Sequence, residues 1–175
     1  MDGSTIVTNS QRVPSGWHFL QLPGPTNIPE QVLRAIHQPA IDHRGDAFAA
    51  MTNELLNDIK GVFKTSKEVF IFPSSGSGAG EAAIANTLSP GDGILMFDSG
   101  QFSKIWIKMA QQFGLDAKVI KNDWRRAPSP EEIEQALRED TKHRIRAVFA
   151  VHNETSTGVT ARIPEIRKAM DAANH

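Results

Sequence analysis

Apolar residues in the second part of the chain come in short continuous runs that are separated by segments with helical periodicity. The runs predict buried strands at residues 69–72, 94–97 and 147–151, and a further strand is predicted at 117–120, where Lys118 interrupts the apolar residues. Continuous rather than alternating apolar runs are typical of strands that are covered on both faces. Helical spacing predicts helices over 81–88, 102–113, 130–137 and 164–172. The alternation therefore predicts a three-layer α/β/α fold with a largely parallel sheet.

The first part of the chain has a different pattern. Residues 1–16 are polar and lack periodicity, so we expect an amino-terminal arm, followed by one domain over residues 17–175. Residues 17–22 are expected to be extended. Pro29 suits the first turn of a helix that stops before Pro39, and apolar positions from Phe48 to Val62 predict a long amphipathic helix.

Composition and charge narrow the classes of partner. Nineteen basic and 20 acidic residues give a net charge of −1 without blocks of like charge, so neither nucleic acid nor an anionic membrane is an expected partner. The absence of cysteine excludes disulfides and cysteine-based metal sites. No apolar run is long enough to span a bilayer, and no targeting signal is visible. We therefore expect a soluble intracellular protein, cytoplasmic or peroxisomal, that binds small molecules or other protein chains.

The segment from Pro73 to Glu81 is the strongest candidate for chemistry. Glycines and serines at 74–80 predict a tight turn between a strand and a helix, where backbone N–H groups and the helix dipole suit a phosphate. The absence of a following Gly-Lys-Ser or Gly-Lys-Thr excludes a Walker-type loop. A dinucleotide site would use Gly76, Gly78 and Asp98, although the glycine rhythm matches only in part. Pyridoxal phosphate is the third candidate.

Five segments in register make the third candidate specific. They are Leu22 to Pro29, Asp42 to Gly45, Pro73 to Ala83, Asn86 to Asp92 and Val151 to Thr160. With these segments the chain resembles the amino-terminal part of a class V aminotransferase of the serine–glyoxylate and alanine–glyoxylate group. The resemblance implies an incomplete large domain of the fold type I aminotransferases, a pyridoxal 5′-phosphate cofactor and a homodimer. Gly80 departs from the pattern, because relatives often carry a bulky residue there.

The resemblance also implies roles for individual residues. Cofactor contacts would be Ser77, Gly78 and Ala79 at the phosphate, Phe102 over the pyridine ring and Thr155 beside it. Alternatively, Phe102 belongs to the core stripe of its helix, and Thr155 bonds its own loop. Substrate contacts would be Gly24, Thr26, Asn27 and His43, each of which is also compatible with a solvated loop. Glu154 and His152 are interpreted as a loop acid and a packed histidine.

The implied reaction is transamination between a small amino acid, serine or alanine, and a 2-oxo acid, glyoxylate or pyruvate. The family's Schiff-base lysine lies in a segment beyond position 175, so none of the lysines present is assigned a catalytic role and this chain alone is expected to be inactive. A helix over 164–172 would normally lead into another buried strand, which also favours a truncated chain. Two alternatives stay open: an NAD-binding oxidoreductase domain, and a non-catalytic truncated product.

Overall fold

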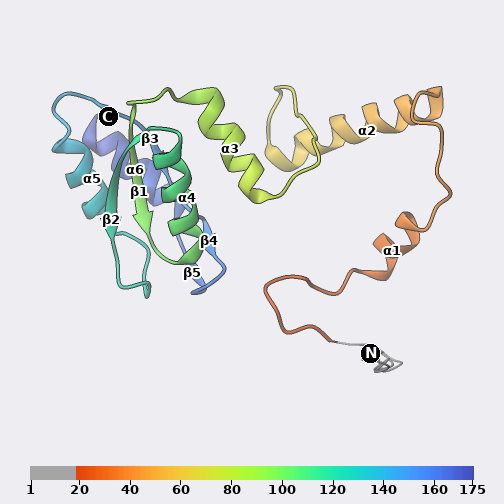
Figure 1. Cartoon of the computed structure of the whole chain (residues 1–175), viewed down its shortest axis with the longest axis horizontal. Helices are drawn as coiled ribbons and strands as arrows, with labels where there is room; N and C mark the ends of the chain where they lie inside the picture. Colours follow the sequence, from red (N-terminus) through yellow and green to blue (C-terminus); the bar gives the residue numbers. More distant parts are fainter. Residues whose placement is uncertain (1–18) are drawn as a thin grey trace, which may run out of the picture. The chain divides into compact units, whose positions relative to one another are not determined.

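The computed structural model describes residues 19–175, which form two compact units that divide between Val69 and Phe70 (Figure 1). The expected arm at residues 1–16, and the start of the extended segment at 17–22, lie outside the described residues. Residues 19–22 form no strand. None of the described helices is long and apolar enough to cross a membrane.

Residues 19–69, the described part of the first unit, contain two helices, both of which the sequence predicted. Helix α1 covers Glu30–Ile36, directly after Pro29, whose fixed φ suits the start of a helix. Helix α2 covers Asp46–Phe63 and ends at Lys64 in the left-handed conformation. Apolar side chains on α2 are exposed in the single chain, including Met51, Leu55 and Val62.

The second unit is built on a parallel sheet of three strands in the order β2-β1-β3. The strands are β1 Gly93–Asp98, β2 Asp116–Lys121 and β3 Ile145–Phe149. The central strand β1 pairs with both neighbours, for example Met96 with Val119 on β2 and with Phe149 on β3. The prediction of a largely parallel sheet is confirmed, with β3 starting and ending two residues earlier than expected.

Helices cover both faces of this sheet, which confirms the three-layer prediction (Figure 1). These helices are α3 Gly76–Thr87, α4 Gln101–Gln112, α5 Pro130–Arg138 and α6 Ile163–Ala173. Successive residues of β1 point to opposite faces. Leu95 and Phe97 pack against α5 and α6, whereas Ile94 and Met96 pack against α3 and α4.

A short antiparallel hairpin follows β3, and the sequence did not predict it. Its strands are β4 Asn153–Glu154 and β5 Val159–Thr160, joined by a four-residue turn. The hairpin lies near the first turn of α4, at the end of the sheet toward which the strands run (Figure 1). Open α/β sheets bind ligands at this end.

The strand predicted at residues 69–72 is wrong. The segment has no strand structure, and Phe70, Ile71 and Phe72 are exposed by 81%, 59% and 51%. Its composition suits a buried strand, but a strand also needs a neighbour that accepts and donates ladder hydrogen bonds. Among the described residues, the ladders of the parallel sheet are made by β1, β2 and β3 alone.

The turn predicted over residues 74–80 is shorter than expected. Helix α3 begins at Gly76, so Ser77, Gly78 and Ala79 lie in its first turn rather than in a loop before it. Glycines have a low helix propensity, so local sequence does not favour a helix here. The helix is stabilised by packing, because Gly80 lies closely against Trp106 of α4.

Candidate functional site

The first turn of α3 presents backbone N–H groups at an exposed helix end. Ser75 is the N-cap residue, and its carbonyl accepts the N–H of Ala79 at 3.2 Å. The N–H groups of Gly76, Ser77 and Gly78 precede this first helical bond and have no acceptor within the helix. The hydroxyl of Ser74 lies against Gly78, in the space that a Cβ there would need. The turn carries no acidic residue, so its positive dipole end is not neutralised locally.

A contact between Gly80 and Trp106 joins α3 to α4. The indole ring of Trp106 lies directly against the Cα of Gly80, where a Cβ would overlap its carbon atoms. Residues three or four positions apart share one face of a helix. Ser77 precedes Gly80 by one turn, and Phe102 precedes Trp106 by one turn. Ser77 and Phe102 therefore each lie one turn before the contact, on the face of their own helix that carries Gly80 or Trp106.

The first turn of α4 is fixed by an unusual cap. Gly100 is its N-cap residue and has no side chain to offer. Ser103 supplies one hydroxyl, which accepts the N–H groups of Ser99 and Gly100 at 2.9 Å each and donates to the carbonyl of Gly100 at 2.7 Å. The amides of Phe102 and Ser103 in this turn are bound by Glu154, which lies far away in the sequence, and that of Gln101 by the hydroxyl of Ser156.

Glu154 is buried and accepts four hydrogen bonds. Its Oε2 accepts the N–H of Ser103 at 2.9 Å, and its Oε1 accepts the N–H of Phe102 at 3.2 Å. Oε1 also accepts the N–H of Ser156 at 3.1 Å and its hydroxyl at 2.8 Å. Burial raises the pKa of Glu154, but the hydrogen bonds from Ser103, Ser156 and Phe102 outweigh it and hold the pKa below its ordinary value. The side chain is therefore an ionised hydrogen-bond acceptor at neutral pH.

These bonds place Phe102 and Thr155 at the junction of α4 and the hairpin. Phe102 is 43% exposed, so it is not a member of the buried core as the alternative interpretation held. Thr155 is exposed at the start of the hairpin turn, between Glu154 and Ser156. A further bond from the hydroxyl of Thr157 to the carbonyl of Ser99, at 3.2 Å, ties the same two segments together.

Asp98 is engaged with an aromatic side chain at the end of β1. Its Oδ1 accepts the indole N–H of Trp124 at 2.7 Å, and the ammonium of Lys104 lies 4.5 Å from the centre of the Trp124 ring. If Asp98 bound a ribose, as in a dinucleotide site, its carboxylate oxygens would have to accept the ribose hydroxyl groups. One of them is bound by Trp124, which gives the residue a structural role.

The substrate candidates lie in the first unit and are described separately from the cofactor candidates. Gly24, Thr26 and His43 are exposed. Asn27 is half-buried, and its Oδ1 accepts the N–H of Leu20 at 2.9 Å, which ties the loop together across seven residues. Their roles stay predictions.

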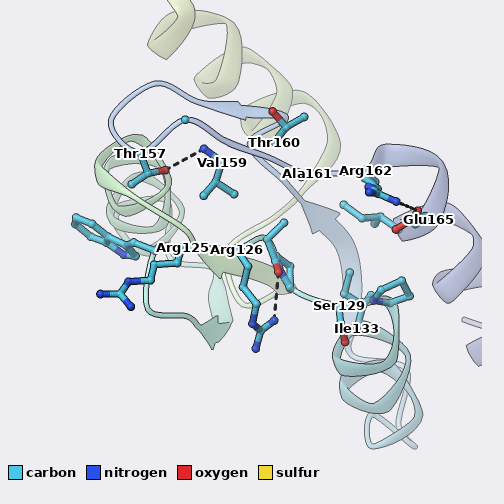
Figure 2. A pocket seen from close by; sticks show the side chains of 16 residues that line it. Arg125, Arg126, Ser129, Ile133, Thr157, Val159, Thr160, Ala161, Arg162 and Glu165 are labelled. Carbon is cyan, nitrogen blue, oxygen red and sulfur yellow. Dashed lines mark hydrogen bonds and ion pairs between the residues drawn. The ribbon is translucent and has the colours of Figure 1, made fainter.

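A cavity of about 700 Å³ opens beside α5, the hairpin and the start of α6 (Figure 2). Three arginines line it. Arg126 is paired with Glu132 at 2.7 Å and Arg162 with Glu165 at 2.9 Å, whereas Arg125 extends from the neighbouring loop. Ser77, Phe102 and Thr155 do not line this cavity, so it is separate from the cofactor candidates.

The residues that assemble the site cannot be identified from the sequence alone. Sequence alone predicts Glu154 to be a loop acid and assigns no role in the site to Ser103, Ser156 or Trp106. The sequence contains one indication. Gly100 precedes the first turn of α4 and has no side chain that could accept a hydrogen bond from that turn, so the acceptor must come from another part of the chain. The sequence could not show which residue supplies it.

Comparison with known proteins identifies a family. A family model described as aminotransferase class-V matches residues 18–175. A serine–glyoxylate aminotransferase of Methylorubrum extorquens is 50% identical over 161 residues, which are 91% of this chain and 40% of that protein. An L-aspartate–glyoxylate aminotransferase of Paracoccus denitrificans is 46% identical over 88% of this chain and 39% of that protein.

A solved structure agrees with the sequence matches. The crystal structure of an alanine–glyoxylate aminotransferase from Nostoc sp. has a TM-score of 0.78 and 29% sequence identity, and the likeness covers 93% of this chain and 43% of that one. The chain thus spans about two fifths of the length of the curated relatives it matches.

Proposed function

Because the chain belongs to the class-V aminotransferases, we propose that it contributes the phosphate and ring contacts of a pyridoxal 5′-phosphate site in a transaminase. The observation that carries this proposal is the junction of α3, α4 and the hairpin. The Gly80–Trp106 contact joins α3 to α4, and Glu154 joins the first turn of α4 to the hairpin, which lies at the end of the sheet where α/β folds bind ligands (Figure 1).

The first turn of α3 fits a phosphate. The N–H groups of Ser77 and Gly78 lack acceptors within the helix, the hydroxyl of Ser74 lies beside Gly78, and the first turn carries no acid that would compete for the helix dipole. We assign Ser77 and Gly78 as backbone donors. Ala79 shapes the turn, since its own N–H is bound by Ser75.

Phe102 and Thr155 fit the ring. An exposed phenyl group held on a rigid first helical turn offers a flat apolar face for stacking, and its exposure leaves that face accessible. The hydroxyl of Thr155 can donate a hydrogen bond to the phenolic oxygen attached to the cofactor ring. When bound, the cofactor would supply the electron sink that stabilises negative charge at the substrate carbon. The role of these residues is to hold the ring in one orientation and to exclude water from one of its faces.

The substrates are proposed from the chemistry that the relatives share. Their names pair glyoxylate with serine or aspartate, and that of the structural neighbour pairs it with alanine. We propose glyoxylate as acceptor and a small amino acid, serine or alanine, as donor, so that serine would yield hydroxypyruvate and glyoxylate would yield glycine. Gly24, Thr26, Asn27 and His43 remain the proposed substrate contacts.

A homodimer is part of the proposal. Helix α2 exposes Met51, Leu55 and Val62 by 49%, 50% and 78% in the single chain, and exposed apolar side chains of this kind are typical of an interface. Light scattering on the purified protein would report a dimeric mass if the proposal holds and a monomeric mass if it does not.

The proposal is tested by titrating the 175-residue chain with pyridoxine 5′-phosphate, which lacks the aldehyde and so cannot react with surface lysines. Saturable quenching of tryptophan fluorescence, reversed by inorganic phosphate, is the expected result. Lack of saturable binding would refute the proposed site. The proposed substrates are tested by assaying glycine formation from glyoxylate with serine or alanine as donor, using a protein of the relatives' full length that contains this chain, and lack of transfer from both donors would refute them.

A further inference from the structure

The first turn of α4 is capped by Glu154, which lies 52 positions after Phe102 and 51 positions after Ser103 in the sequence. An N-cap side chain normally accepts the N–H of the second or third helical residue, and here these residues are Phe102 and Ser103. Gly100 cannot supply this acceptor, and the carboxylate of Glu154 takes its place. Gly100 is also what allows the approach, because a Cβ there would overlap Cγ and Cδ of Glu154.

The same carboxylate holds the hairpin. Glu154 accepts the N–H and the hydroxyl of Ser156, and the hydroxyl of Ser156 in turn accepts the N–H of Gln101 at 2.9 Å. Glu154 and Ser156 flank Thr155 on both sides. The position of Thr155 relative to Phe102 therefore depends on one network centred on the Glu154 carboxylate.

We propose that Glu154 is a positioning residue for the cofactor ring, whose carboxylate fixes the α4 turn that carries Phe102 against the hairpin that carries Thr155. This inference rests on the proposed function and deepens it. Glu154 needs no contact with the cofactor for this role. Its effect passes through the backbone of Phe102 and the two bonds of Ser156.

A carboxylate suits this position better than an amide. The groups around its two oxygens are all donors: the N–H groups of Phe102, Ser103 and Ser156, and the Ser156 hydroxyl. An amide would turn its own NH₂ group toward at least one of these donors and lose that bond. The negative charge also lies at the positive end of the α4 dipole, where it is favourable.

The experiment separates ring binding from phosphate binding. Dissociation constants for pyridoxine 5′-phosphate and for inorganic phosphate are measured on the 175-residue chain and on Glu154→Gln. The phosphate donors are on α3 and make no bond to Glu154, so only the ring contacts should change. We expect Glu154→Gln to weaken binding of pyridoxine 5′-phosphate by about tenfold and to change phosphate binding by less than about twofold.

Two further variants keep the test decisive. Ile133→Val truncates a buried side chain of α5 that packs on the opposite face of the sheet from α4, and it serves as the control for lost thermal stability. It should leave both dissociation constants unchanged. Ser156→Ala removes the link to Gln101 while Glu154 stays in place, and should weaken ring binding by about threefold. It decides the question if Glu154→Gln does not fold.

The outcomes separate this inference from the proposed function. A Glu154→Gln chain that binds both ligands as the unmodified chain does, or that loses both to the same degree, would overturn the positioning role. Unchanged ring binding by Ser156→Ala would count against it in the same way. If the unmodified chain binds pyridoxine 5′-phosphate no more tightly than inorganic phosphate, the proposed function itself fails.

Discussion

The indole ring of Trp106 on α4 occupies the space that a side chain at Gly80 on α3 would need. Relatives often carry a bulky residue at position 80, where this chain has glycine. In this chain the space between α3 and α4 is filled from the other helix, by the Trp106 ring. Trp106 also lies against Phe149 of β3, with ring centres 4.7 Å apart. The contact thus links two helices to the sheet directly beneath the candidate site.

Replacing Gly80 should therefore destabilise the second unit. In Gly80→Ala the added methyl group would overlap the Trp106 ring, and overpacking of this kind costs about 1–3 kcal/mol of the free energy of unfolding. Urea unfolding followed by tryptophan fluorescence measures it. Gly76→Ala is the matched control, because a Cβ there meets nothing within 4 Å and alanine favours the helix. Equal stability of Gly80→Ala and the unmodified chain would contradict the close contact.

A negative charge at Ser77 should have opposite effects on stability and on binding. Ser77→Asp places a carboxylate in the first turn of α3, which has no acid, and should stabilise the helix by about 0.3–1 kcal/mol. The same charge would repel a phosphate, so binding of pyridoxine 5′-phosphate should be lost. Thermal unfolding and ligand titration measure the two effects, with Ser77→Asn as the uncharged control. Retained binding in Ser77→Asp would place the anion elsewhere.

The hydrogen bond from Trp124 to Asp98 should contribute to stability. Trp124→Phe keeps an aromatic ring but removes the donor, which leaves a half-buried carboxylate oxygen without its 2.7 Å partner. Loss of a hydrogen bond to a charged group costs about 1.5–3 kcal/mol. Asp98→Asn, whose amide oxygen can still accept, should lose less when both are unfolded in urea. The structural role of Asp98 would be refuted by a Trp124→Phe variant as stable as the unmodified chain.

Acid should remove the stability that the start of α5 gains from Glu132. Its carboxylate accepts two bonds from Arg126, at 2.7 and 2.8 Å, and the N–H of Ser129 at 2.7 Å. These bonds lower the pKa of Glu132 from 4.5 to about 2. Because the pKa is lower in the folded state, this stability is fully present above pH 4.5 and is lost as the pH falls toward about 2.

Glu132→Gln measures this contribution. The variant should be less stable than the unmodified chain at pH 7 by about 1 kcal/mol, a value reduced for the partial exposure of the ion pair. The difference in melting temperature should then shrink as the pH is lowered from 5 toward 2. Glu134→Gln on the same helix removes a more local ion pair with Arg138 and should cost less. A Glu132→Gln difference that stays constant with pH would contradict the assignment.

Local pattern was sufficient for most of the second unit. Apolar residues placed β1, β2 and β3, in continuous runs for β1 and β3, and helical spacing placed α3 to α6, because burial on one or two faces leaves a pattern in the sequence. The family also follows from sequence, and the turn that we propose to bind phosphate can be named from it, since its glycines and serines are neighbours along the chain. The same reasoning failed at residues 69–72, where the composition suits a strand but the described chain offers no partner for its ladder.

The assembly of the site was decided only by the tertiary structure. The sequence shows that Gly100 cannot cap its helix, that Gly80 has no side chain and that Glu154 is acidic. It does not show that Glu154 caps the α4 turn or that Trp106 fills the space at Gly80. Periodicity records which residues are buried within one element, whereas these contacts depend on which elements the folded chain brings together. Phe102, Thr155 and Ser77 can be named from sequence, but the bonds and packing that would orient them come from residues that only the fold makes their neighbours.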